Sequence, residues 1–117
     1  MIPSGGDLSL PSIATLQKVL ADMRSAINSG KCQFIPRDKN MRTLTGLGLS
    51  VQDMKDEIYS LTPSQYHAGP KVDRNDPSSD FWWEFKTRID GQVIYIKFKI
   101  LYQTDDSMLL MSFHFDE

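Results

Sequence analysis

The C-terminal third of the chain contains residues that could cleave an RNA phosphodiester bond without a metal. Such a reaction needs a base for the 2′-hydroxyl, cations for the phosphorane and an acid for the leaving 5′-oxygen. His114 suits acid or base work because an imidazole has an ordinary pKa of about 6.5. Lysine and arginine suit the phosphate, and an aromatic ring gives a base a surface on which to stack. These candidates are Lys86, Arg88, Lys97, Lys99 and Trp82.

Alternating polar and apolar residues predict three strands, over residues 81–89, 92–102 and 108–115. The Asp90-Gly91 pair predicts a two-residue hairpin turn, which sets Glu84 opposite Lys97. The same register sets Lys86 opposite Tyr95 and leaves aliphatic and aromatic residues together on the core face. The other face then carries Trp82, Glu84, Lys86, Arg88, Tyr95, Lys97 and Lys99.

In the last strand, alternation predicts that Ser112 and His114 join this polar face together with Leu110. A turn with an even number of residues places Tyr95 beside His114, whereas a register slip of two places Lys97 there. The core is expected to receive Leu109, Met111, Phe113 and Phe115.

Several roles stay open for this face. His114 could be the base or the acid, with Tyr95 orienting it or sharing the proton transfer. Lys86, Arg88, Lys97 and Lys99 would bind phosphate, while Glu84 could tune Lys97 or act as the base. The alternative is a charged face that is simply solvated, in which Glu84 and Lys97 form an ordinary cross-strand pair.

Helical spacing predicts the elements that position this face. Ser12 is expected to begin a helix that ends near Gly30, and Ser50 begins another, with Asp53 completing a capping box. A short strand is expected over 31–35, a short helix from Asp38, a turn over 46–49 and a long loop over 67–80. The fold class predicted is α+β: two to three N-terminal helices packed on a C-terminal antiparallel β-meander. Residues 1–11 are expected to be a flexible arm and 12–117 a single domain.

Composition narrows the classes of function. The chain has 117 residues, a net charge of −2 and a single cysteine, Cys32, which cannot form an internal disulfide. We expect a cytoplasmic protein, without a signal peptide and without contact with a membrane, because no apolar run approaches roughly 18–20 residues. The net charge argues against indiscriminate nucleic-acid binding. The sequence contains no phosphate-binding loop and no zinc-ligand spacing, so we expect neither cofactor nor metal.

An ordered set of short motifs runs through residues 15–117. It comprises residues 35–40 (IPRDKN), 47–50 (LGLS), 61–66 (LTPSQY), 69–70 (GP), 73–74 (DR), 81–85 (FWWEF), 91–100 (GQVIYIKFKI) and 112–115 (SFHF). This set resembles the MqsR (motility quorum-sensing regulator) toxins of type II toxin–antitoxin systems. The resemblance implies a fold related to RelE-type ribonucleases and a metal-independent mRNA endoribonuclease that inhibits translation. Its partners would be mRNA and a cognate antitoxin protein, with a homodimer left open.

The resemblance also assigns residues. It places the family's tyrosine at Tyr95 and the neighbouring lysine at Lys97, and it implies that His114 and His67 replace two family lysines. A family glutamine corresponds to Trp83 or Glu84, which departs from the pattern, as does the negative net charge. The rival hypothesis is a catalytically inactive protein-interaction module that uses an exposed Trp82 and a free sheet edge.

Overall fold

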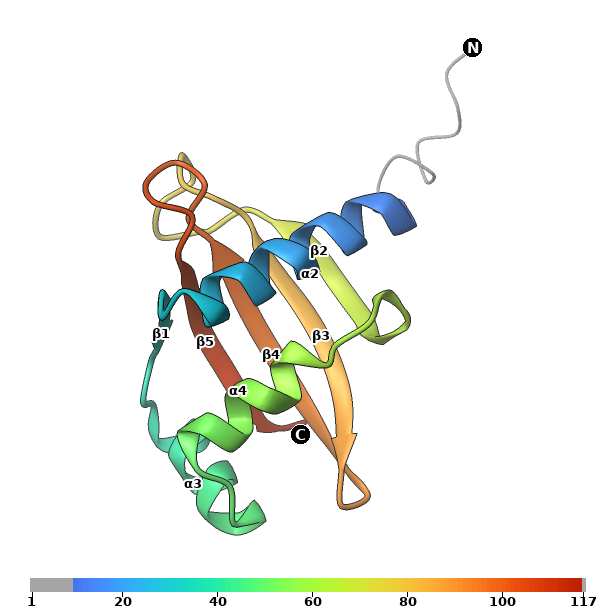
Figure 1. The fold of residues 1–117 in the computed structure, drawn as a ribbon, viewed down its shortest axis with the longest axis vertical. Helices are drawn as coiled ribbons and strands as arrows, with labels where there is room; N and C mark the ends of the chain where they lie inside the picture. Colours follow the sequence, from blue (N-terminus) through green and yellow to red (C-terminus); the bar gives the residue numbers. More distant parts are fainter. Residues whose placement is uncertain (1–9, 117) are drawn as a thin grey trace.

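The chain folds as three helices packed against a five-stranded sheet, within the residues that the computed structural model describes, 10–116 (Figure 1). The helices are α2 (Ile13–Asn28), α3 (Asp38–Leu47) and α4 (Val51–Tyr59), followed by one 3₁₀ turn (Pro63–Gln65). The strands are β1 (Cys32–Phe34), β2 (Tyr66–Lys71), β3 (Trp82–Ile89), β4 (Gln92–Ile100) and β5 (Met108–Phe115), in the spatial order β1-β5-β4-β3-β2. The α+β prediction is confirmed.

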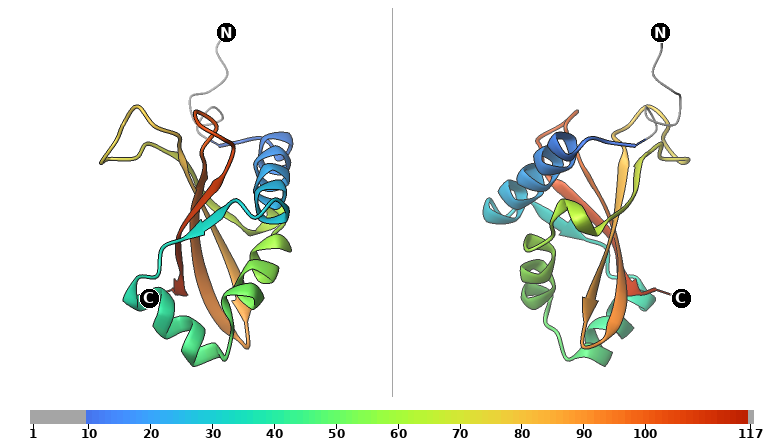
Figure 2. Two further views of the ribbon diagram at one scale, coloured as in Figure 1. Left: turned by 60° about the vertical axis from the view of Figure 1, so that its left-hand side comes forward. Right: turned by 90° about the vertical axis from the view of Figure 1, so that its right-hand side faces the viewer.

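Helices α2 and α4 cover one face of the sheet and begin where the sequence predicted (Figure 2). The Ser12 hydroxyl accepts a hydrogen bond from the Thr15 amide, and Ser50 and Asp53 form the predicted capping box. The buried stripe of α2 is formed by Leu16, Val19, Leu20, Met23 and Ala26, and that of α4 by Met54 and Ile58. These side chains and the apolar face of the sheet form one connected core.

The hairpin between β3 and β4 has the predicted register. Asp90 and Gly91 both have positive φ angles, +51° and +77°, as a tight two-residue turn between antiparallel strands requires. Glu84 therefore lies opposite Lys97, and Lys86 lies opposite Tyr95. Their alternation sends Phe85, Ile94, Ile96 and Phe98 into the core.

A β-bulge in β5 corrects the predicted faces of that strand. Tyr95 pairs with His114 and Lys97 with Ser112, as predicted, but Phe98 then pairs with Leu110, so Met111 is an extra residue. The bulge shifts the alternation by one residue. Leu110 and Met108 are consequently buried in the core, whereas Leu109 and Met111, which were expected there, line a groove on the other face.

Helix α3 follows β1 along the chain and packs against β5. Strand β1 pairs in parallel with Met108 to Leu110 only, and the buried Asn40 side chain continues the contact. Its amide nitrogen donates to the Met111 carbonyl and its oxygen accepts from the Phe113 amide. The helix begins at Asp38 and runs through Leu47, so the expected turn over 46–49 is reduced to Gly48, whose φ of +69° ends the helix.

The expected loop over 67–80 starts as a strand. β2 pairs antiparallel with β3, so the sheet is a four-stranded antiparallel meander extended by the parallel β1. Of the expected arm, residues 1–9 lie outside the described part, and residues 10 and 11 precede α2. No helix within residues 10–116 has the length and apolar character needed to cross a membrane.

Candidate functional site

Tyr95 and His114 lie side by side on the sheet face that α2 and α4 do not cover. Their ring centroids are 5.2 Å apart at an interplanar angle of 37°, and both side chains are half-buried. The Nδ1 atom of His114 is 3.0 Å from the Phe115 carbonyl oxygen. Because a carbonyl oxygen only accepts, Nδ1 carries the hydrogen in this contact, and Nε2 is the ring nitrogen that can take up a proton.

The Tyr95 hydroxyl is held in its protonated form. Burial raises the pKa of Tyr95 far above its ordinary value, and the negative charge and hydrogen bond of Glu84 raise it further. Arg37 acts in the opposite direction through its positive charge. Tyr95 therefore carries its proton at neutral pH and can donate it in a hydrogen bond, although the raised pKa makes it a weaker acid than an ordinary tyrosine.

Glu84 is a buried carboxylate at the centre of the site, with 5% of its surface exposed. Burial alone would raise its pKa, but hydrogen bonds from Lys71 and Tyr95 and the charges of Lys71 and Lys97 outweigh this effect and lower it. Its ion-pair partner is Lys71, at 2.9 Å, rather than the predicted Lys97. A carboxylate with a lowered pKa is a weak base, so this environment suits Glu84 to positioning Tyr95 and neutralising lysines.

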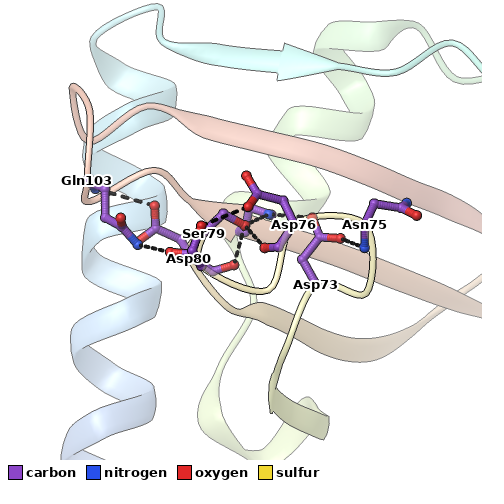
Figure 3. A network of polar contacts seen from close by, with 8 residues as sticks. Asp73, Asn75, Asp76, Ser79, Asp80 and Gln103 are labelled. Carbon is purple, nitrogen blue, oxygen red and sulfur yellow. Dashed lines mark hydrogen bonds and ion pairs between the residues drawn. The ribbon is translucent and has the colours of Figure 1, made fainter.

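The predicted open face is covered at its end nearest the β4–β5 turn. The segment 72–81 folds over β4, where the Lys99 ammonium contacts the Asp73 carboxylate at 2.8 Å and the Ser79 hydroxyl at 3.0 Å. Hydrogen bonds within the loop and to Gln103 of the β4–β5 turn hold it together (Figure 3). Lys99 is only 3% exposed, so its ammonium is not presented to solvent as the phosphate-binding role requires.

Trp82 is buried as well, with 6% of its surface exposed, so the expectation of an exposed tryptophan is wrong. The ammonium groups of Lys97 and Lys99 lie 4.9 and 4.4 Å from the centroid of its ring. The loop that closes over the sheet is the physical reason for this burial. The rival interaction module loses its proposed anchor, because a buried ring cannot lead a docking contact.

The remaining predicted residues lie around this centre. Lys86, opposite Tyr95, forms an ion pair of 2.8 Å with Asp116. Arg88 is exposed at the hairpin end, with Nη1 3.3 Å from the Gly91 carbonyl. His67 is exposed on β2, where the pairing with β3 is irregular, and among residues 10–116 its side chain forms no hydrogen bond or ion pair. The structure thus brings Tyr95, His114, Glu84, Lys97 and Lys86 together and leaves His67 apart from their contacts.

Arg37 belongs to this site although no role was predicted for it. The connection between β1 and α3 brings its Nη1 to 3.1 Å from the Ser112 hydroxyl, next to Lys97 in the sheet. It lies within the IPRDKN motif, but the motif alone does not reveal that this segment meets β5. Beside it runs a groove of about 580 Å³ whose lining combines cations, acids and apolar side chains: Arg37, Lys71, Arg74, Lys97, Asp73, Asn75, Glu84, Val72, Trp82, Leu109 and Met111.

No protein-family model matches the chain, and no curated protein does. Within residues 10–116, no three histidine, cysteine or acidic side chains lie together as a potential metal-ligand set. The absence of a metal from the reaction stays a prediction.

Proposed function

We propose that the chain is a metal-independent endoribonuclease that acts as the toxin of a type II toxin–antitoxin pair, as its resemblance to MqsR toxins implies. One observation carries the proposal. The ring centroids of His114 and Tyr95 lie 5.2 Å apart; Nε2 of His114 is available to take a proton, and the Tyr95 hydroxyl is protonated. Lys97 and Arg37 flank the two rings. These are the base, the acid and the cations that cleavage by a 2′-hydroxyl needs.

In the proposed reaction, Nε2 of His114 removes the proton from the ribose 2′-hydroxyl while that oxygen attacks the adjacent phosphorus. Lys97 and Arg37 stabilise the charge that develops on the non-bridging oxygens. The bond from phosphorus to the 5′-oxygen then breaks, and the Tyr95 hydroxyl protonates the leaving oxygen. An alkoxide is a stronger base than a phenolate, so this transfer is downhill even from a tyrosine with a raised pKa. The products are a 2′,3′-cyclic phosphate and a 5′-hydroxyl.

The groove beside these residues supports an RNA substrate. Its volume of about 580 Å³ falls in the range of ligand sites, and its lining contains both apolar side chains, which suit a base, and cations, which suit a phosphate. Bases that can enter such a groove come from single-stranded RNA, since those of a duplex are stacked. The groove therefore suits a single-stranded substrate such as mRNA. The other proposed partner is an antitoxin that covers this face, and the proposed location is the cytoplasm.

The test combines expression and purified protein. The wild type, His114→Ala, Tyr95→Phe and Lys97→Ala are induced in a bacterial host without antitoxin, and growth and RNA 5′ ends are followed. The purified proteins are then incubated with a single-stranded RNA in the presence of a chelator, and the ends of the products are analysed. We expect growth arrest and cyclic-phosphate products with the wild type. His114→Ala should be slower by about 10²–10⁴-fold, the usual contribution of a general base.

Lys18→Ala is the matched control for Lys97→Ala, because Lys18 is an exposed lysine on α2, whose helix covers the opposite face of the sheet. It should cleave as the wild type does. The proposal fails if the folded wild type leaves both growth and RNA unchanged. It also fails if His114→Ala cleaves at the wild-type rate.

A further inference from the structure

Helix α3 brings a second group of positive charges to His114. Lys39 and Arg42 are three residues apart and therefore neighbours on the helix surface. Together with Thr43 they line a small cavity of about 70 Å³ whose opposite wall is His114 and Phe115 of β5.

Hydrogen bonds fix this placement. The Asn40 side chain joins α3 to the backbone of Met111 and Phe113, and the Thr43 hydroxyl accepts from the Phe115 amide at 3.1 Å. These bonds connect one turn of the helix to alternate residues of β5, and they oppose sliding of the helix along the strand. The two cations are thereby held beside His114, although they are exposed.

The positive groups follow β5 in a line. Arg37 contacts Ser112, and Lys97 pairs with Ser112 in the sheet. His114 follows two residues later, and Lys39 and Arg42 share a cavity with His114 and Phe115. At about 3.4 Å per residue, the line is about 10 Å long, with the acid–base pair between its ends. Within residues 10–116, neither Lys39 nor Arg42 forms an ion pair; Asp116, which follows Phe115, pairs with Lys86.

We propose that Lys39 and Arg42 bind the phosphate next to the one that is cleaved, so that a single RNA strand runs along β5 from Ser112 past Phe115. This inference rests on the proposed function for the identity of the central phosphate. Two unpaired cations beside a histidine form a site for an anion, and a second site in line with the first selects a strand with several phosphates over a single nucleotide.

The test uses a ten-nucleotide RNA in which every 2′-hydroxyl is methylated, so that binding is measured without cleavage. Fluorescence anisotropy gives the affinity between 50 and 200 mM salt for the wild type and for Lys39→Gln/Arg42→Gln. Removing one cation that neutralises a phosphate of a single strand lowers the salt slope by about 0.7. Because Lys39 and Arg42 share one phosphate, the double variant should have a slope lower by about 0.7, and the wild type should lose about 2.6-fold more affinity over this range.

Two further variants make the result specific. Lys18→Gln/Lys55→Gln removes the same charge from α2 and α4. It should change the salt slope by less than half as much as Lys39→Gln/Arg42→Gln does. Lys39→Arg/Arg42→Lys keeps the charge and should bind as the wild type does. The inference is overturned if the two neutralising variants behave alike, or if the wild type does not bind.

Cleavage of the unmodified RNA separates this inference from the proposed function. If Lys39→Gln/Arg42→Gln binds and cleaves like the wild type, the nuclease stands and the phosphate site on α3 is wrong. If the wild type binds through Lys39 and Arg42 but cleaves no RNA, the site stands and the nuclease is wrong.

Discussion

Replacing Asn40 with alanine should destabilise the fold far more than its polar character suggests. The side chain is fully buried and forms three hydrogen bonds, with the carbonyls of Ile35 and Met111 at 2.9 Å and with the Phe113 amide at 3.1 Å. Loss of the two bonds to carbonyls costs about 1 kcal/mol each, since both carbonyls keep a contact with Arg37, and the Phe113 amide left unpaired costs about 1–3 kcal/mol. The better helix propensity of alanine returns about 0.6 kcal/mol. We expect a net loss of about 3 kcal/mol.

Urea unfolding followed by tryptophan fluorescence measures this loss, because Trp82 and Trp83 are both buried. With a slope of about 1–3 kcal/mol per molar, the midpoint should fall by about 1–3 M. Asn28→Ala is the matched control. The Asn28 amide is exposed and donates to the Tyr59 hydroxyl at 3.0 Å, so its loss should cost no more than about 0.5 kcal/mol.

Function should follow the same contacts. Without Asn40, α3 keeps only the Thr43 hydroxyl bond to the backbone of β5, so we expect both the Arg37 contact with Ser112 and the cavity beside His114 to loosen. RNA cleavage should therefore fall even at temperatures where the variant is folded. The reasoning is refuted if Asn40→Ala and Asn28→Ala lower the free energy of unfolding equally, because the hydrogen bonds to β5 would then contribute nothing.

Three other perturbations test the electrostatics of the site. Lys99→Met should speed proteolysis within segment 72–80 by about tenfold, because the segment loses a charge-assisted hydrogen bond. If the protease cuts Lys99→Met no faster than the control Lys18→Met, the buried pair does not hold the segment. Asp116→Asn releases Lys86, so the salt slope of RNA binding should steepen by about 0.7; an unchanged slope would show that Lys86 faces no phosphate. The lowered pKa of Glu84 stabilises the fold above its unfolded value of about 4.3, and this advantage is lost as the pH falls through the folded value. The free energy of unfolding of the wild type relative to Glu84→Gln should therefore decline between pH 6 and 3, and a constant difference would refute the ionised, hydrogen-bonded carboxylate.

Local signals in the sequence were sufficient for most of the helices and for the β3–β4 hairpin. Ser12 and Ser50 are caps whose hydrogen bonds lie within three residues, and Asp90-Gly91 fixes a register between strands that adjoin each other in the chain. Alternation also predicted that Tyr95 and His114 share a face, whereas their direct pairing was one of two registers that the sequence left open. Such features depend on neighbours in sequence, which is why they can be read from it.

Contacts between distant segments decided the rest. Beyond the end of β1, the edge of β5 is bonded by Asn40, more than seventy residues away, whose side chain contacts the Met111 carbonyl and the Phe113 amide. Alternation assumes an unbroken period of two, so it inverted Leu109 and Leu110.

The residues of the candidate site also fall into those that the sequence located and those that only the tertiary structure brought together. The sequence placed Tyr95, Lys97 and His114 on one face, since alternation along neighbouring strands determines that. Only the tertiary structure brought Arg37 to Ser112 and closed segment 72–81 over Trp82 and Lys99, because a loop without periodicity carries no signal of the surface that it will cover.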